Sequence, residues 1–134
     1  MQFSRSTLYA LYAAMELAST EETVTVASVA ERYGLPPGAL AKVFQQLVRA
    51  GLAVGVRGVG GGYRLARAPS AVTVLDVISV FDAPRTNGHF LLGERSEEAR
   101  AQPADERLSR LFDEVAEVVS STFASVSLET LVRS

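Results

Sequence analysis

Apolar residues recur three and four positions apart near the start of the chain, and this spacing predicts an amphipathic helix that runs to about Ala18. Ser4 or Ser6 can cap its first turn. Arg5 lies beside the free N–H groups of that turn, where its charge opposes the helix dipole, so we expect it either to contact phosphate or to be solvated. The face expected to be buried consists of Leu8, Leu11, Tyr12, Met15 and Ala18.

A polar break at residues 21–23 precedes a second predicted helix, Val26 to Tyr33. Thr25 suits its N-cap, and Gly34 stands where a helix commonly ends. Val24, just before the cap, is expected to add a short strand. The apolar positions of this helix are Val26, Val29, Ala30 and Tyr33.

Pro36 and Pro37 turn the chain, and a proline in the first turn starts a third helix, Pro37 to Ala50. Its periodicity directs one face to the core: Leu40, Val43, Phe44, Leu47 and Val48. The opposite face is small or polar, with Gly38, Lys42, Gln45 and Arg49 at its centre and Ala39, Ala41 and Gln46 at its flanks. A solvated face would show the same pattern, so this helix alone selects no function.

Two β-type runs, 52–56 and 63–66, are joined by a glycine-rich turn and predict a β-hairpin. Arg57 and Arg64 flank the turn, whose glycines are Gly58, Gly60, Gly61 and Gly62. Such a tip suits close approach to a polyanion, because glycine places no side chain in the way. A helix-turn-helix followed by this hairpin predicts a winged helix, whose usual partner is DNA.

With the hairpin beside it, the third helix is expected to place its N-terminal part against base edges in the major groove. Lys42 could donate to guanine, and Gln45 could pair with adenine. Ala39 or Ala41 could touch a thymine methyl group. Arg49, at the far end of the helix, is expected to reach a phosphate.

Ser70 or Thr73 is expected to begin a fourth helix over residues 74–81 that Pro84 ends. Residues 85–103 show little apolar periodicity and predict a loop. A long helix follows Pro103, and Ser127 can cap a short last helix over residues 128–132. No remaining element can cover the apolar stripe of the long helix, so we expect the same helix of a second copy to do so. The stripe consists of Leu108, Leu111, Phe112, Val115, Val118, Val119, Thr122, Phe123 and Val126.

The predicted fold is therefore mainly α with a small β-hairpin: a winged helix-turn-helix plus a long C-terminal dimerisation helix. The predicted division is a DNA-binding domain over residues 1–84, a loop over 85–103, and a dimerisation helix with a short C-terminal helix over 104–134. Charge follows this division. Residues 1–70 carry seven basic and four acidic groups, whereas residues 71–134 carry six basic and eleven acidic groups. The positive field thus coincides with the DNA-binding pattern, although the net charge of the whole chain is −2.

The chain contains no cysteine, which excludes disulfides, thiolate redox chemistry and cysteine-ligated metals. His89 is the one histidine, and with scattered carboxylates around it we expect no metal site and no cofactor. No apolar run is long enough to span a membrane, and the N-terminus lacks the apolar core of a secretory signal. A cytoplasmic protein is expected.

Four segments carry a family resemblance: FSRSTLYAL, VASVAERYGLPPGALAKVFQQLVRAGL, VRGVGGGYRLA and VTVLDVI. Over residues 1–84 the chain resembles the IscR/NsrR-like bacterial regulators, the Rrf-two family. The resemblance implies a homodimeric winged-helix transcription factor, usually a repressor, that binds a partly palindromic site in double-stranded DNA. It also implies that Arg57 and the glycines after it follow the DNA backbone or enter the minor groove, and that residues 38–42 read bases. Pro37, Tyr63 and Arg64 complete the set of residues expected to bind DNA.

Two departures from the family pattern bear on function. Well-known members hold an iron–sulfur cluster with three cysteines between the fourth helix and the long helix, and this chain has none. Val59 stands where proline is common, which should reduce the rigidity of the wing. A cluster-free regulator could respond to a small molecule, to a partner protein, or to neither. The aromatic residues available to line a cavity or to fill the core are Phe81, Phe90, Phe112 and Phe123.

Two other function classes compete with a DNA-binding regulator. A phosphate-binding enzyme is disfavoured, because the glycine run lacks the Lys-Ser/Thr ending of a P-loop and leads into Tyr63 rather than a helix. No nucleophile–base pair accompanies it, so we predict no enzymatic activity. A winged-helix interaction module that does not bind DNA is the second alternative, and Lys42, Arg57 and Arg64 argue against it.

Overall fold

The computed structural model describes residues 3–82 and 88–134. The first range contains α1 (Arg5–Ala18), α2 (Val26–Tyr33), α3 (Pro37–Arg49), β1 (Ala53–Val56), β2 (Gly62–Leu65), the 3-10 turn η1 (Pro69–Ala71) and α4 (Val74–Asp82). The second contains α5 (Gly88–Leu92), α6 (Glu97–Arg100), α7 (Pro103–Ala124) and α8 (Leu128–Arg133). The mainly helical fold with one antiparallel hairpin is confirmed. Pro84, the predicted end of the fourth helix, lies outside the described residues.

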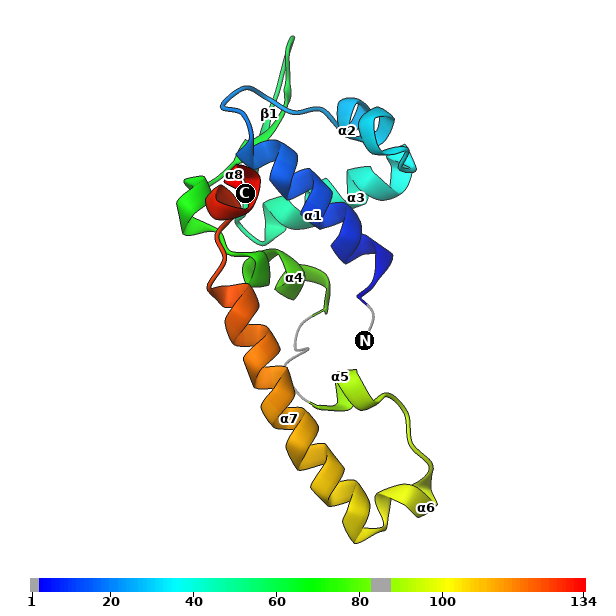
Figure 1. Ribbon diagram of the computed structural model, residues 1–134. Coiled ribbons are helices and arrows are strands. Elements are labelled where there is room, and N and C mark those ends of the chain that lie inside the picture. Colours follow the sequence, from blue (N-terminus) through cyan, green and yellow to red (C-terminus); the bar gives the residue numbers. More distant parts are fainter. Residues whose placement is uncertain (1–2, 83–87) are drawn as a thin grey trace.

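The molecule has two parts (Figure 1). We call α1 to α4, the hairpin and α8 the head, and α5 to α7 the arm. The hairpin projects from one end of the head, and α7 extends away from the other end. No helix within the described residues is long and apolar enough to cross a membrane.

Local signals set the boundaries of α2. The Thr25 hydroxyl accepts a hydrogen bond from the Ser28 N–H at 3.1 Å, and Gly34 adopts a left-handed φ of 64° that ends the helix. Both predicted boundaries are confirmed. The predicted strand at Val24 is also present, as an isolated antiparallel bridge to Tyr63.

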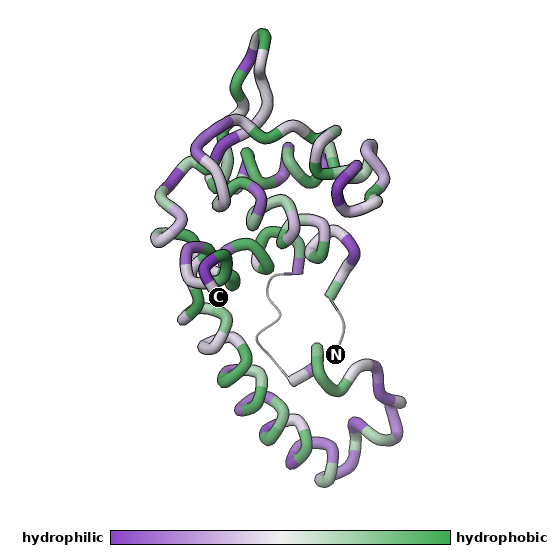
Figure 2. The backbone as a smooth tube through the Cα atoms, turned by 45° about the horizontal axis from the view of Figure 1, so that its top comes forward, coloured by the Kyte–Doolittle hydropathy of each residue, from purple (hydrophilic) through white to green (hydrophobic). Residues whose placement is uncertain are grey.

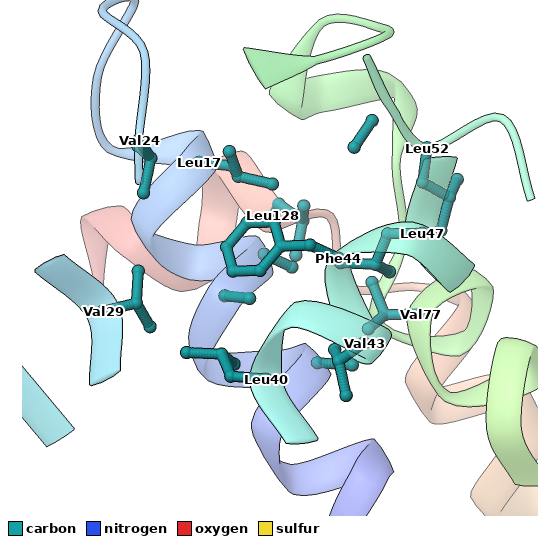
Figure 3. Close-up of a cluster of buried hydrophobic side chains, with 14 of the residues drawn as sticks. Leu17, Val24, Val29, Leu40, Val43, Phe44, Leu47, Leu52, Val77 and Leu128 are labelled. Carbon is teal, nitrogen blue, oxygen red and sulfur yellow. The ribbon is translucent and has the colours of Figure 1, made fainter. Parts of the chain in front are cut away.

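The core of the head lies between α1, α3 and the elements around them (Figure 3). Phe44, Leu40 and Leu47 of α3 are almost completely buried, and burial of each such side chain contributes about 1.5–3 kcal/mol. Leu128 of α8 reaches the same core. The Leu128 N–H donates to the Val72 carbonyl at 2.8 Å, so the C-terminal segment is fixed to the head.

The predicted buried face of α1 is wrong in part. Leu8 is 47% exposed, whereas the helix buries Thr7, Ala10, Ala13, Ala14 and Leu17. Three of these five residues are alanines, whose small side chains let the neighbouring helices approach closely. Large apolar side chains dominate a periodicity argument, but packing on several sides of α1 favours small ones.

Two further positions differ from the prediction. Val48 was expected in the core but is 37% exposed, because at 100° per residue it lies at the edge of the stripe set by Leu40 and Leu47. Val126 was expected on the long helix but follows its end, and its carbonyl accepts from the Val74 N–H at 2.9 Å.

The predicted loop also contains two short helices, α5 and α6. Long-range contacts stabilise them: the Gly88 N–H donates to Asp113 of α7 at 2.5 Å, and Arg95 pairs with Asp105 at 2.5 Å. A Cβ at position 88 would lie 2.8 Å from the Asp113 nitrogen, so α5 can begin against α7 only with glycine there. Periodicity within the segment gives no sign of these contacts.

Candidate nucleic-acid interface

The third helix presents its small and polar residues to solvent. Lys42, Gln45 and Arg49 are exposed along α3, and Ala41 is half-buried. Pro37 occupies the first helical turn, and no side chain caps it. The first turn is also bare, because Pro37, Gly38 and Ala39 are exposed and carry little side chain. A flat surface of this kind can approach another molecule closely.

A groove of about 600 Å³ borders this face. Gly38, Ala39 and Lys42 line it from α3, Ser6 lines it from α1, and Phe81 lines it from α4. The groove brings the first turn of α1 beside the first turns of α3. The sequence indicates Ser6 only as a possible cap of the first helix, because nothing in its local pattern places it next to α3.

The wing is a two-stranded ribbon with a glycine tip. Ala53 pairs with Leu65 at its base and Val56 with Gly62 near its tip. Gly58 and Gly60 adopt positive φ angles of 100° and 76°, which glycine accepts without a steric penalty. Val59 between them is fully exposed.

The two arginines that flank the glycine run lie on different faces of the ribbon. Arg57 borders a shallow depression together with Tyr63, whereas Arg64 borders another hollow together with Arg67, near the C-terminal end of α1. Alternation along β2 explains the separation, because Tyr63 and Arg64 are neighbours that point to opposite sides, and Arg57 borders the same depression as Tyr63. Arg57 lies next to the tip, and Arg64 pairs in register with Val54, closer to the base.

Tyr63 is a packing residue at the base of the wing. Its ring is half-buried, with its centroid 4.7 Å from that of Phe44 in α3. Its backbone N–H and carbonyl both bond to Val24 at 2.8 Å. Gly62 permits this approach, because a Cβ there would lie 2.6 Å from the Val24 oxygen. The wing base is therefore joined to both α3 and the segment before α2.

Arg5 is exposed in the first turn of α1, and a buried carboxylate holds this turn in place. Asp82, 2% exposed at the end of α4, accepts hydrogen bonds from the Ser4 N–H at 3.1 Å and the Ser4 hydroxyl at 3.2 Å. It also accepts from the hydroxyl of Thr7, which is fully buried. Negative charge at a helix N-terminus is favourable, so Asp82 stabilises the turn that presents Arg5.

The cations of this surface differ from those elsewhere in the chain. Across residues 3–82 and 88–134, none of the predicted DNA-binding cations forms an ion pair: Arg5, Lys42, Arg49, Arg57 and Arg64. By contrast, Arg32 pairs with Glu16 at 3.1 Å, and Arg95 pairs with Asp105. The charges near α3 and the wing thus remain available to an external anion.

The predicted stripe of α7 divides into two faces. Phe112, Val119 and Phe123 are half-buried against their own chain, and Phe123 lies 5.9 Å from Phe3 between ring centroids. Phe90 of α5 stacks on Phe3 at 5.3 Å, so these rings pack together at the junction of head and arm. The other face is exposed and consists of Leu108, Leu111, Val115, Val118 and Thr122. We call this second face the α7 seam.

Metal ligands do not gather in the described part of the chain. His89 lies 3.7 Å from Glu94, and both side chains are largely exposed. Among residues 3–82 and 88–134, no three His, Asp or Glu side chains come together in a way that could hold a metal ion.

Comparisons with known proteins find relatives along nearly the whole chain. The sequence pattern of the Rrf2 family, described as an iron-dependent transcriptional regulator, matches residues 3–134. The chain is 36% identical over 134 residues to the putative HTH-type transcriptional regulator BadM of Rhodopseudomonas palustris, covering 99% of this chain and 82% of that one. It is 33% identical over 140 residues to the HTH-type transcriptional regulator IscR of Xenorhabdus nematophila, covering 99% and 80%.

A solved structure shows the same architecture. CymR, described as the global cysteine regulator of B. subtilis, superposes with a TM-score of 0.81 at 28% identity, covering 99% of this chain and 97% of that one. The relatives are named as transcriptional regulators rather than as enzymes. With its winged helix, its unpaired cations and this match along nearly its whole length, the chain belongs to the Rrf2 family of transcriptional regulators.

Proposed function

We propose that two copies of this chain bind a partly palindromic DNA site and repress transcription from it. The observation that carries the proposal is the set of unpaired cations on α3 and the wing, on the same molecule as an uncovered apolar seam on α7. The cations supply contacts to DNA, and the seam supplies the pairing that a two-fold site requires. The chain acts without catalysis, in the cytoplasm.

The third helix reads the major groove in this proposal. Lys42 donates to guanine, and Gln45 pairs with adenine. Ala39 or Ala41 touches a thymine methyl group, and the bare first turn over residues 37–39 lets the helix enter the major groove deeply. Arg49 reaches a phosphate.

The wing and α1 bind the DNA backbone on either side of α3. Arg57 enters the minor groove or follows the phosphates, and the glycine tip supports this close approach. Arg64, on the other face of the ribbon, reaches a phosphate outside the minor groove. Arg5 binds a DNA phosphate beside the groove of the protein that Ser6, α3 and Phe81 line.

The α7 seam supports a homodimer. Its apolar residues follow alternating steps of three and four, which is the spacing that two helices need to pack along one line. Val118 is 66% exposed and Leu111 is 53% exposed, and a second α7 would remove both from water. The other face of α7 is occupied by α5 and α4, so the seam is the face left for a partner.

Iron does not fit the donors of this chain, although the family description names it. Iron–sulfur clusters are held mainly by cysteine thiolates, and the sequence has no cysteine. The His89–Glu94 pair offers two exposed donors and no third in the described residues. We therefore derive no regulatory step through iron. An effector, if there is one, is a small molecule or a partner protein.

Binding to DNA selected from a random-sequence pool tests the proposal. Arg57→Ala should weaken binding of the selected duplex at least tenfold and reduce the slope of log affinity against log salt by about 1. The matched control is Arg100→Ala, which removes an exposed arginine of α6 and should bind as the wild type does. Selection of no duplex, with an intact dimer, would instead favour an interaction module without DNA binding.

A further inference from the structure

The wing tip is the least supported part of the proposed interface. Residues 58–61 form a turn in which the Gly61 N–H donates to the Gly58 carbonyl at 2.9 Å. Val59 projects fully into solvent, and the two glycines beside it have the widest conformational freedom of any residue type. A tip of this composition needs an outside contact if it is to keep one direction.

Thr23 supplies such a contact. Its hydroxyl donates to the carbonyl oxygen of Gly60 at 2.6 Å. The residues lie 37 positions apart in the sequence, and Thr23 belongs to the segment that joins α1 to α2. The hydrogen bond therefore links the wing tip to the helix-turn-helix.

The neighbours of Thr23 make this segment a rigid support. Val24 exchanges two backbone hydrogen bonds with Tyr63, each 2.8 Å long, and Thr25 caps α2. These bonds hold the wing base, two residues or more from the tip. Only the Thr23 hydroxyl extends this support from the base to Gly60 within the described residues.

We infer that Thr23 is a positioning residue for DNA binding: its hydroxyl fixes the direction of the wing tip, and with it the approach of Arg57 to the minor groove. The inference rests on the proposed function. Pre-organisation of the tip reduces the loss of conformational freedom on binding, so removal of the hydroxyl weakens affinity without removing any contact to DNA. Water can satisfy the freed Gly60 carbonyl but cannot orient it.

A pair of variants separates the hydroxyl from the shape of the side chain. Thr23→Val removes the hydroxyl and keeps the branched Cβ, whereas Thr23→Ser keeps the hydroxyl. Amide hydrogen exchange by NMR, without DNA, should show the Gly61 N–H exchanging about two to ten times faster in Thr23→Val, the range of one neutral hydrogen bond. The Tyr63 N–H, bonded to Val24, should exchange at the wild-type rate in both variants.

Affinity for the duplex selected by the wild-type protein completes the test. Thr23→Val should bind about two to ten times more weakly, although thermal unfolding should show it fully folded at the assay temperature, and Thr23→Ser should bind as the wild type does. Wild-type affinity of Thr23→Val would overturn the inference, whatever the exchange rates. If Arg57→Ala also kept wild-type affinity, the proposed wing-dependent function itself would fail, and the two failures are thereby distinguished.

Discussion

The helices α3 and α7 are both amphipathic, but the molecule treats their apolar faces differently. In the head, α3 buries Leu40, Val43, Phe44 and Leu47 within its own chain, and its exposed face is small and polar. In the arm, the described contacts of α7 fully bury only Ala116, and large apolar side chains remain in water along the seam. Figure 2 shows this mixture of hydrophobic and hydrophilic positions along α7.

The exposed faces of α3 and α7 suit opposite kinds of partner. The exposed face of α3 carries unpaired positive charge and little side-chain bulk, which suits a polyanion with a groove. The exposed face of α7 carries leucine and valine, which suit an apolar surface of matching periodicity. The head therefore completes its own core, whereas the arm leaves large apolar side chains exposed, which the proposed dimer would cover.

Charge placed on the α7 seam is the strongest test of the contrast between α3 and α7. Leu111→Glu with Val118→Glu should give a monomer whose head remains folded, and DNA affinity should fall about 10²- to 10⁴-fold because bivalent binding is lost. Analytical ultracentrifugation and binding to the selected duplex measure both effects. Glu114→Gln with Glu117→Gln, on the same helix but off the seam, is the control and should remain dimeric. A double-Glu variant that stays dimeric would contradict the seam.

The spacing of the DNA half-sites tests whether arm and head act together. A two-fold dimer with each α3 in a major groove requires half-sites about one helical turn apart, or a multiple of it. An insertion of about five base pairs rotates one half-site by half a turn and should weaken binding about tenfold to hundredfold. An insertion of about ten should weaken binding too, because it restores the rotation but moves the half-site about 34 Å farther away. Equal affinity for all three duplexes would show that each head binds alone.

Local sequence signals predicted those parts of the head that local interactions determine. Thr25 and Gly34 gave the bounds of α2, and the glycine run gave the position of the wing. The same signals could not predict that Leu128 enters the core of the head, because that contact joins the end of the chain to Val72. Long-range contacts of this kind have no periodicity that a window of sequence can show.

The residues of the candidate interface also divide into those that local sequence predicts and those that only the fold reveals. Exposure of Lys42 and Gln45 follows from the helical period of α3, and sequence reasoning found both. The sequence pattern did not reveal Thr23 or Asp82, because each bonds to a partner more than thirty positions away. Thr23 bonds to Gly60, and Asp82 bonds to the first turn of α1. Side chains proposed to contact DNA are visible as a sequence pattern, whereas side chains proposed to position them are visible only in the fold.

Asp82 offers a way to weaken the head from within while leaving the seam intact. Asp82→Ala leaves the buried Thr7 hydroxyl and the Ser4 N–H without this acceptor and should lower the free energy of unfolding by about 2–4 kcal/mol. Urea unfolding measures the change. Asp76→Ala, which removes a half-buried acceptor of the Thr73 N–H, should cost only about 1 kcal/mol. Equal losses in the two variants would show that burial of Asp82 adds nothing.

The smallest expected effect concerns Glu16, the carboxylate that pairs with Arg32 of α2 and accepts a hydrogen bond from Tyr33. Glu16 accepts from Arg32 at 3.1 Å and from the Tyr33 hydroxyl, and this hydrogen bond, with burial and the charge of Glu16, raises the pKa of Tyr33 above its ordinary value. A raised pKa in the folded state means that the contact stabilises the protein below about pH 10 and ceases to do so as pH rises through the folded pKa.

Tyr33→Phe should therefore lower the free energy of unfolding by about 0.5 kcal/mol at pH 7, since the pair is partly open to water, and the difference from wild type should shrink above about pH 10. Urea unfolding at both pH values measures it. In a Glu16→Gln background the Tyr33→Phe difference should depend less on pH, because the negative charge that opposes ionisation is gone and only burial still raises the pKa of Tyr33. A pH-independent difference in the wild-type background would mean that Glu16 does not hold Tyr33 in solution.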